Sequence, residues 1–179
     1  MEFTQRSTGI FVKEVSRQGG TTGVIFRPVL SKGQVFLYLE IAENVNNGRR
    51  RAMSKSFLMG NEAIGLGAVR AGVQVVSGYP GTPSTEVLET VAKHNPGDIY
   101  VEWSVNEKAG MEVAAAAAYT GARAMVTMKQ VGLNVASDPL MSLAYVGVKG
   151  GMVVMVADDP GPISSQTEQD TRHYGQFSK

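Results

Sequence analysis

One passage of the chain indicates the fold, residues 99–121, which read IYVEWSVNEKAGMEVAAAAAYTG. Its first five residues are strand-like, and the alanine run that follows is strongly helix-forming until Gly121 ends it. Glu107 stands at the junction, at the carboxyl end of the predicted strand and the amino end of the predicted helix. Ligands bind at this edge of open α/β sheets, although an acidic first helical turn is also explained by the helix dipole alone.

Apolar runs alternate with helical patterns along the chain downstream of residue 57. Short buried runs predict strands, and apolar residues at helical spacing predict the helices between them. We predict strands at 73–76, 99–103, 124–128 and 152–157, with helices at 61–71, from the cap residue Ser84 to 91, over the alanine run, and around 135–145. Four strands alternating with helices imply an α/β fold, a parallel sheet flanked by helices with right-handed crossovers.

The loops that follow these strands differ from the loops that precede them. In a parallel sheet all strand-to-helix loops leave from the same edge. These loops hold most of the glycines, prolines and polar residues that periodicity leaves unexplained; they are residues 78–84, 104–107, 129–134 and 158–165. The helix-to-strand returns are short and plain, so we predict a binding site at the carboxyl edge of the sheet.

Five motifs, four of them in or next to these loops, also resemble a known family. They are YPGTPS (79–84), YVEWSVNEK (100–108), TMKQVGLN (127–134), ADDPGP (157–162) and QTEQDTRHY (166–174). From about Leu58 onward the chain resembles the large (alpha) subunits of the indolepyruvate:ferredoxin oxidoreductases. These belong to the thiamine-diphosphate-dependent 2-oxoacid:ferredoxin oxidoreductases. The resemblance implies a pyrimidine-type thiamine-diphosphate-binding domain over residues 53–179, incomplete at its carboxyl end.

The resemblance gives Glu107 a role. In that family a glutamate opening this helix hydrogen-bonds the aminopyrimidine ring of the cofactor and so promotes deprotonation of the thiazolium carbon. We predict that Glu107 is catalytic and binds the cofactor, together with Tyr79, Pro80, Gly132 and Asn134.

Three residues are predicted to bind the substrate. Thr82 resembles a threonine that contacts the substrate carboxylate in related enzymes, and its plain alternative is a turn residue beside Pro83. Lys129 and Gln130 follow a strand end and could meet an anionic substrate, or be an ordinary solvated loop. Related pyruvate enzymes use an arginine where this chain has Asp158-Asp159, which fits an arylpyruvate branch better than a pyruvate branch.

The resemblance further implies oxidative decarboxylation of an aryl 2-oxoacid to acyl-CoA in anaerobic amino-acid catabolism. It implies a beta subunit, ferredoxin and coenzyme A as partners, and Mg²⁺ bound by a domain absent here. Iron–sulfur clusters are expected in the full-length subunit but not in this chain, which has no cysteine. As a fragment, the chain is expected to be inactive alone. Another thiamine-diphosphate enzyme, such as a pyruvate oxidoreductase or a 2-oxoacid decarboxylase, and a non-enzymatic α/β binding module remain alternatives.

Composition excludes several other classes. The 179 residues suffice for one compact domain, and a net charge of +1 with no basic face argues against nucleic-acid binding. No run of about 18 apolar residues predicts a membrane span, and no secretory signal is recognisable, so a cytoplasmic protein is expected. His94 and His173 lack ligands at metal spacing, so no metal site is predicted.

Residues 1–52 form a leader without a recognisable motif, expected to be irregular apart from one hairpin around residues 35–39. Three arginines, 49–51, lie just ahead of Met53. If their codons include AGG-AGG, they would spell a bacterial ribosome-binding sequence. We therefore hypothesise that Met53 is the true start and that the leader is translated upstream sequence.

Overall fold

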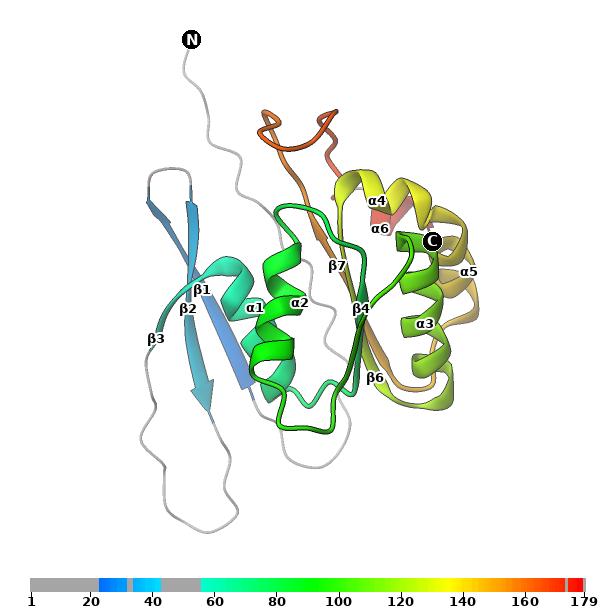
Figure 1. The fold of residues 1–179 in the computed structure, drawn as a ribbon, viewed down its shortest axis with the longest axis horizontal. Coiled ribbons are helices and arrows are strands. Elements are labelled where there is room, and N and C mark those ends of the chain that lie inside the picture. Colours follow the sequence, from blue (N-terminus) through cyan, green and yellow to red (C-terminus); the bar gives the residue numbers. More distant parts are fainter. Residues whose placement is uncertain (1–22, 32–33, 43–55, 173, 179) are drawn as a thin grey trace.

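The computed structural model of the chain describes residues 23–31, 34–42, 56–172 and 174–178. Its centre is a four-stranded parallel sheet in the order β5-β4-β6-β7 (Figure 1). The strands are β4 (Val75–Gly78), β5 (Tyr100–Trp103), β6 (Arg123–Lys129) and β7 (Gly151–Ala157). This confirms the predicted α/β fold and parallel sheet, although β4 begins and ends two residues later than predicted.

Helices cover both faces of this sheet (Figure 1). On one face lie α1 (Gly60–Arg70) and α2 (Thr85–Lys93). On the other lie α3 (Glu107–Thr120), α4 (Gln130–Val135) and α5 (Ser137–Val146), with the short α6 (Tyr174–Ser178) against α5. Strand β6 is buried on both sides because its residues alternate: Met125 packs towards α2, whereas Val126 and Met128 pack towards α3.

The alanine helix α3 is held at both ends by its sequence. Asn106 is its N-cap and accepts a hydrogen bond from the backbone N–H of Ala109 at 2.8 Å. Gly121 ends it with a φ of 108°, a left-handed conformation that glycine adopts without steric cost. Small side chains let the helix approach the sheet closely, and the buried Ser77 hydroxyl donates to the carbonyl of Gly110 at 2.7 Å. The amino end of α3, and Glu107 with it, is thereby fixed at the carboxyl end of β4.

The segment after β6 differs from its prediction as a loop. Residues 130–135 form helix α4, with Lys129 at its N-cap position. Burial explains this difference, because Gln130, Gly132 and Leu133 pack inward against the core under α3. The side chain of Ser84 is another difference, since Ser84 occupies the N-cap position of α2 but donates to the carbonyl of Gly81 instead of capping the helix.

An antiparallel sheet of three strands lies beyond α1 (Figure 1). It consists of β1 (Gly23–Ser31), β2 (Gln34–Ala42) and β3 (Ser56–Met59). The pairing of β1 with β2 confirms the predicted hairpin, so the leader is regular over these strands. Met53 and the three arginines before it lie outside the described residues, and the hypothesis on the start of translation stays a prediction.

Candidate functional site

The loops at the carboxyl edge of the sheet are joined to one another by side chains. Ser164, in the loop after β7, donates its hydroxyl to the carbonyl of Thr82, in the loop after β4, at 3.2 Å. The Lys129 ammonium, after β6, approaches the carbonyl of Ser164 at 3.5 Å. Glu107, after β5, packs on Gly132 of α4. The predicted gathering of the four loops at one edge is therefore what the structure has.

Glu107 lies half-buried as the first residue of α3. Its carboxylate makes no hydrogen bond or ion pair with any other described residue. The side chain rests on the backbone of Gly132, where an added Cβ would lie 2.5 Å from both Cγ and Oε1 of Glu107. A carboxylate that has space made for it but no partner is able to accept a hydrogen bond from a ligand.

Three other side chains, in β6, at the start of α4 and in the segment after β7, carry polar atoms without partners. The part of the chain that the structure describes has three buried side-chain oxygens with no hydrogen-bond partner: Thr127 Oγ1, Gln130 Oε1 and Ser165 Oγ. Gln130 is fully buried, and its amide nitrogen donates to the carbonyl of Thr167 at 3.1 Å, which leaves the oxygen free. Buried oxygens without a partner are rare in folded proteins, and a water, an ion or a ligand can supply the missing hydrogen bond. Thr127 and Ser165 were not among the residues predicted from sequence.

Lys129 is a half-buried cation whose aliphatic carbons lie against Gly81. No carboxylate among the described residues pairs with its ammonium, whose contact is the neutral carbonyl of Ser164. Its positive charge is therefore available to an anion. Thr82 is exposed in the neighbouring loop after β4. Ser164 contacts both Thr82 and Lys129, so these two predicted residues lie on either side of it.

Of the other residues predicted to bind the cofactor, Tyr79 and Pro80 are exposed at the carboxyl edge of the sheet, whereas Asn134 is hydrogen-bonded to another side chain of the protein. Tyr79 and Pro80 directly follow β4 and are exposed, beside the exposed Trp103 at the end of β5. Asn134 pairs its side-chain amide reciprocally with that of Gln169, at 2.8 and 3.0 Å. This pairing fastens the segment after β7 to α4, a structural contact that the sequence did not indicate.

The segment after β7, residues 158–171, is called the strap below. Asp158 accepts hydrogen bonds from the backbone N–H and the hydroxyl of Thr171, at 2.9 and 2.6 Å. Asp159 Oδ2 accepts from the backbone N–H groups of Ile163, Ser164 and Ser165, at 3.2, 3.1 and 3.1 Å. The hydrogen bond from the Ser164 backbone, with those from its neighbours, lowers the pKa of Asp159 below its usual value. An aspartate followed by proline and glycine is a turn signal that could have predicted this role.

Glu102, the acidic residue of β5, differs from Glu107 because other side chains donate hydrogen bonds to it. Glu102 accepts hydrogen bonds from the hydroxyls of Tyr100 and Ser104, which lower its pKa, the tyrosine contributing most. The same bond to Glu102 raises the pKa of Tyr100. Glu102 is thus satisfied within its own strand, unlike Glu107.

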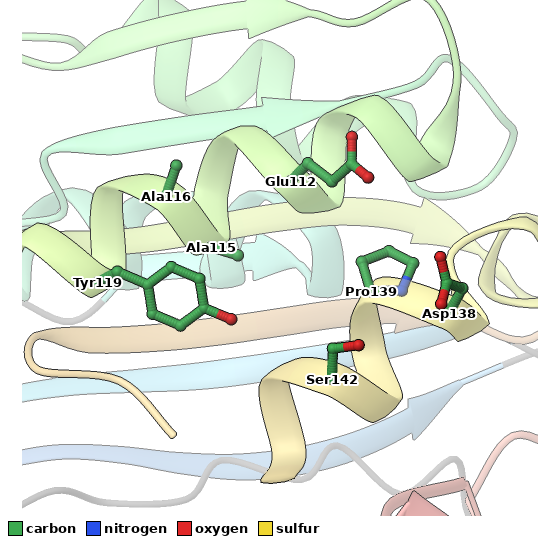
Figure 2. A pocket seen from close by; sticks show the side chains of 7 residues that line it. All are labelled: Glu112, Ala115, Ala116, Tyr119, Asp138, Pro139 and Ser142. Carbon is green, nitrogen blue, oxygen red and sulfur yellow. The ribbon is translucent and has the colours of Figure 1, made fainter. Parts of the chain in front are cut away.

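A separate groove of about 320 Å³ lies between α3 and α5 (Figure 2). Its lining comes from Glu112, Ala115, Ala116, Tyr119, Asp138, Pro139 and Ser142. An ion pair of 2.9 Å joins Lys108 of α3 to Asp138. None of the predicted site residues lines this groove.

Among the described residues no helix is both long and apolar enough to cross a membrane, and no three His, Cys, Asp or Glu gather as metal ligands would.

A parallel sheet with an unpaired carboxylate opening a helix at its carboxyl edge defines a ligand-binding α/β domain. The chain belongs to the family described as "Pyruvate flavodoxin/ferredoxin oxidoreductase, thiamine diP-bdg", whose profile matches residues 66–167. This match covers four of the five motifs completely and the first two residues of the fifth, and it confirms the resemblance that the motifs predicted.

Six relatives at 48–54% identity share the name of the indolepyruvate oxidoreductase subunit IorA, and two at 30% and 32% are named 2-oxoglutarate synthase subunit KorA. The chain is 53% identical over 130 residues to the indolepyruvate oxidoreductase subunit IorA of Archaeoglobus fulgidus, covering 70% of this chain and 21% of that protein. It is 54% identical over 139 residues to the subunit IorA of Methanothermobacter thermautotrophicus, covering 76% and 22%. The chain thus spans about a fifth of the length of these curated relatives.

A solved structure is similar in fold. The 2-oxoglutarate:ferredoxin oxidoreductase from Magnetococcus marinus, with 2-oxoglutarate, coenzyme A and succinyl-CoA bound, superposes with a TM-score of 0.54. The identity is 29%, and the match covers 65% of this chain and 21% of that one. The likeness supports the α/β fold described above.

Proposed function

We propose that this chain is the pyrimidine-side thiamine-diphosphate domain of an indolepyruvate:ferredoxin oxidoreductase large subunit. The proposed reaction is the oxidative decarboxylation of aryl 2-oxoacids to acyl-CoA with reduction of ferredoxin. One observation carries the proposal: the Glu107 carboxylate opens α3 without a partner and is seated on Gly132. The identities favour the indolepyruvate branch, because they reach 53–54% with two indolepyruvate subunits against 29% with the 2-oxoglutarate enzyme.

The residues present fit the pyrimidine side of the cofactor. When bound, thiamine diphosphate supplies an electron sink for the carbon that loses carbon dioxide. Glu107 would hold the aminopyrimidine ring and control a proton at a ring nitrogen, since its carboxylate is an unused acceptor. Gly132 leaves the space in which that carboxylate lies. The free oxygen of Gln130 is a further acceptor at the start of α4.

The substrate end of the site is assigned to the loops after β4 and β6. Lys129 would attract the substrate carboxylate because its charge is not compensated by a described carboxylate. Thr82 would add a hydroxyl from the facing loop, and Tyr79 and Pro80 would form the exposed rim. Asn134 would act on the cofactor side only indirectly, through the strap that it holds.

The rest of the enzyme is proposed to lie outside these residues. A Mg²⁺ site for the diphosphate is proposed to lie there. The iron–sulfur clusters are proposed to lie there too, because such clusters are held by cysteine thiolates and the 179 residues contain no cysteine. A beta subunit, coenzyme A and ferredoxin are the proposed partners, and the cytoplasm the proposed location.

Binding of the cofactor is the direct test. Calorimetric titration of thiamine diphosphate with Mg²⁺ into the complete oxidoreductase is expected to show one site per large subunit. Replacing Glu107 with alanine removes the proposed acceptor and is expected to weaken binding about tenfold, the usual scale for a charged hydrogen bond. Glu112→Ala, an exposed acid five residues further along α3, is the matched control and should bind like the wild type.

Two outcomes would contradict the proposal, one for the cofactor and one for the substrate. If the wild-type enzyme takes up no thiamine diphosphate, the cofactor assignment is wrong. If it binds the cofactor but reduces ferredoxin with 2-oxoglutarate and not with indolepyruvate or phenylpyruvate, the substrate assignment is wrong and the family assignment stands.

A further inference from the structure

Two neighbouring aspartates hold the two ends of the strap. Asp158 bonds to Thr171, at its far end, whereas Asp159 turns back to three consecutive backbone N–H groups, 163–165, at its near end. Both carboxylates therefore accept hydrogen bonds from the protein and are not solvated only by water. Asp159 is 9% exposed, and one of its oxygens receives all three backbone bonds.

Ser164 connects this turn to both predicted substrate-binding loops. Its backbone N–H is held by Asp159, its hydroxyl donates to the carbonyl of Thr82 at 3.2 Å, and its carbonyl faces the Lys129 ammonium at 3.5 Å. The same hydroxyl lies 3.5 Å from Asp159 Oδ2. Asp159 therefore holds Ser164, and Ser164 contacts both the loop of Thr82 and the Lys129 ammonium.

Charge excludes a direct role for Asp159 at an anionic substrate. A carboxylate facing a substrate carboxylate would repel it, and the two would raise each other's pKa. The backbone N–H groups instead disperse the charge of Asp159 within its own turn. Lys129 makes no ion pair with Asp159 or any other described carboxylate, so its charge stays available for the substrate.

We propose that Asp159 is a positioning residue for substrate binding: by holding the 163–165 turn, it places Ser164 between Thr82 and Lys129. The proposal deepens the function proposed above and rests on it, because it takes those two residues to bind the 2-oxoacid. It assigns Asp159 no contact with substrate or cofactor. Asp159 thus acts on the loops after β4 and β6 from the segment after β7, through Ser164.

The test is the Asp159→Asn variant of the complete oxidoreductase, assayed by ferredoxin reduction with indolepyruvate. The amide keeps the size of the carboxylate but loses its charge, so the hydrogen bonds to 163–165 weaken. We expect KM for indolepyruvate to rise about tenfold, the scale of a weakened charged hydrogen bond. The kcat at saturation and the calorimetric affinity for thiamine diphosphate should stay within about twofold of wild type, since among the described residues no hydrogen bond joins Glu107 or Gly132 to the strap.

Three variants separate positioning from general damage. Asp158→Asn weakens the far end of the strap, bonded to Thr171, and should leave KM within about twofold. Ser164→Ala removes the hydroxyl that reaches Thr82 and should raise KM about threefold, while Ser164→Thr keeps a hydroxyl and should restore it. If Asp159→Asn does not assemble, the Ser164 pair decides the question alone.

The outcomes distinguish this inference from the function on which it rests. An unchanged KM in Asp159→Asn or in Ser164→Ala, an equal rise in Asp158→Asn, or a parallel loss of cofactor affinity would overturn the positioning role. A wild-type enzyme without activity on aryl 2-oxoacids would instead overturn the proposed function, whatever the variants do.

Discussion

Replacing Glu107 with glutamine is expected to abolish turnover of the complete oxidoreductase while the fold is kept. The amide has nearly the shape of the carboxylate, and the carboxylate bonds to no other described residue, so no described contact is lost. The loss of a first-turn acid near the helix dipole costs only roughly 0.3–1 kcal/mol. Proton control by a positioned side chain contributes about 10²–10⁴-fold to a rate, and an uncharged amide cannot supply it. Indolepyruvate-dependent ferredoxin reduction should therefore fall by about 10³-fold or more.

The control for this variant is Glu112→Gln on the same helix. Glu112 is exposed and lines the groove between α3 and α5, which none of the predicted site residues lines (Figure 2). The rate of this variant should therefore match the wild type. The far-ultraviolet circular dichroism and melting temperature of both variants should stay close to wild type. Normal ferredoxin reduction by the Glu107→Gln enzyme would refute the catalytic role of this residue.

The fold was predictable because its signals are local. The short apolar run 124–128 is buried on both faces of the sheet, and a strand of this kind needs no alternation with polar residues. The run 152–157 forms the edge strand β7, which is only half-buried, but its apolar residues marked it as a strand as well. The helix α3 carries its own start at Asn106 and its own stop at Gly121. Once the strands are parallel, the common edge of their loops follows from chain direction alone. The position of Glu107 at this edge was predictable for the same reason, and its role stays a proposal.

The inner arrangement of the site was less predictable because it depends on contacts between distant segments. Residues 129–134 were predicted as a loop, yet 130–135 form helix α4, whose buried residues pack in the core with α3. The reciprocal pairing of Asn134 with Gln169 joins segments 35 residues apart and leaves no mark on local periodicity. Asp158 and Asp159 were interpreted as the place of a missing arginine, whereas their geometry shows them bonded to the strap itself.

Gly132→Ala is expected to impair catalysis strongly without destabilising the protein. Its new Cβ would lie 2.5 Å from Cγ and Oε1 of Glu107, closer than any real contact allows. The obstacle is the far end of a flexible side chain, so Glu107 can rotate away at small cost. Gly132 is inside α4, where alanine is favoured over glycine by roughly 1 kcal/mol. The melting temperature should therefore stay the same or rise, while the Glu107 carboxylate moves away from its position against Gly132.

A displacement of about 1 Å at a catalytic group can cost about 10²-fold in rate, and we expect a loss of at least that size. Ferredoxin reduction measures the rate, and calorimetry with thiamine diphosphate should show weaker binding. Combining Gly132→Ala with Glu107→Gln should add little further loss, because both changes remove the same carboxylate from the same place. Independent, additive losses in the double variant would show that Gly132 acts on something other than Glu107.

Gly65→Ala gives the opposite pattern and serves as the matched control. Its Cβ would lie 2.7 Å from Cβ of Thr90 and 2.9 Å from the carbonyl of Val87, where α1 packs on α2. The backbone of α2 cannot move aside as a glutamate side chain can, so this variant should lose stability, by about 1–3 kcal/mol. Its kcat per folded enzyme should remain near wild type, because α1 supplies none of the proposed site residues. If Gly132→Ala destabilised the protein as Gly65→Ala does, with full activity in the folded fraction, Gly132 would be a packing glycine and Glu107 would not depend on the space it leaves.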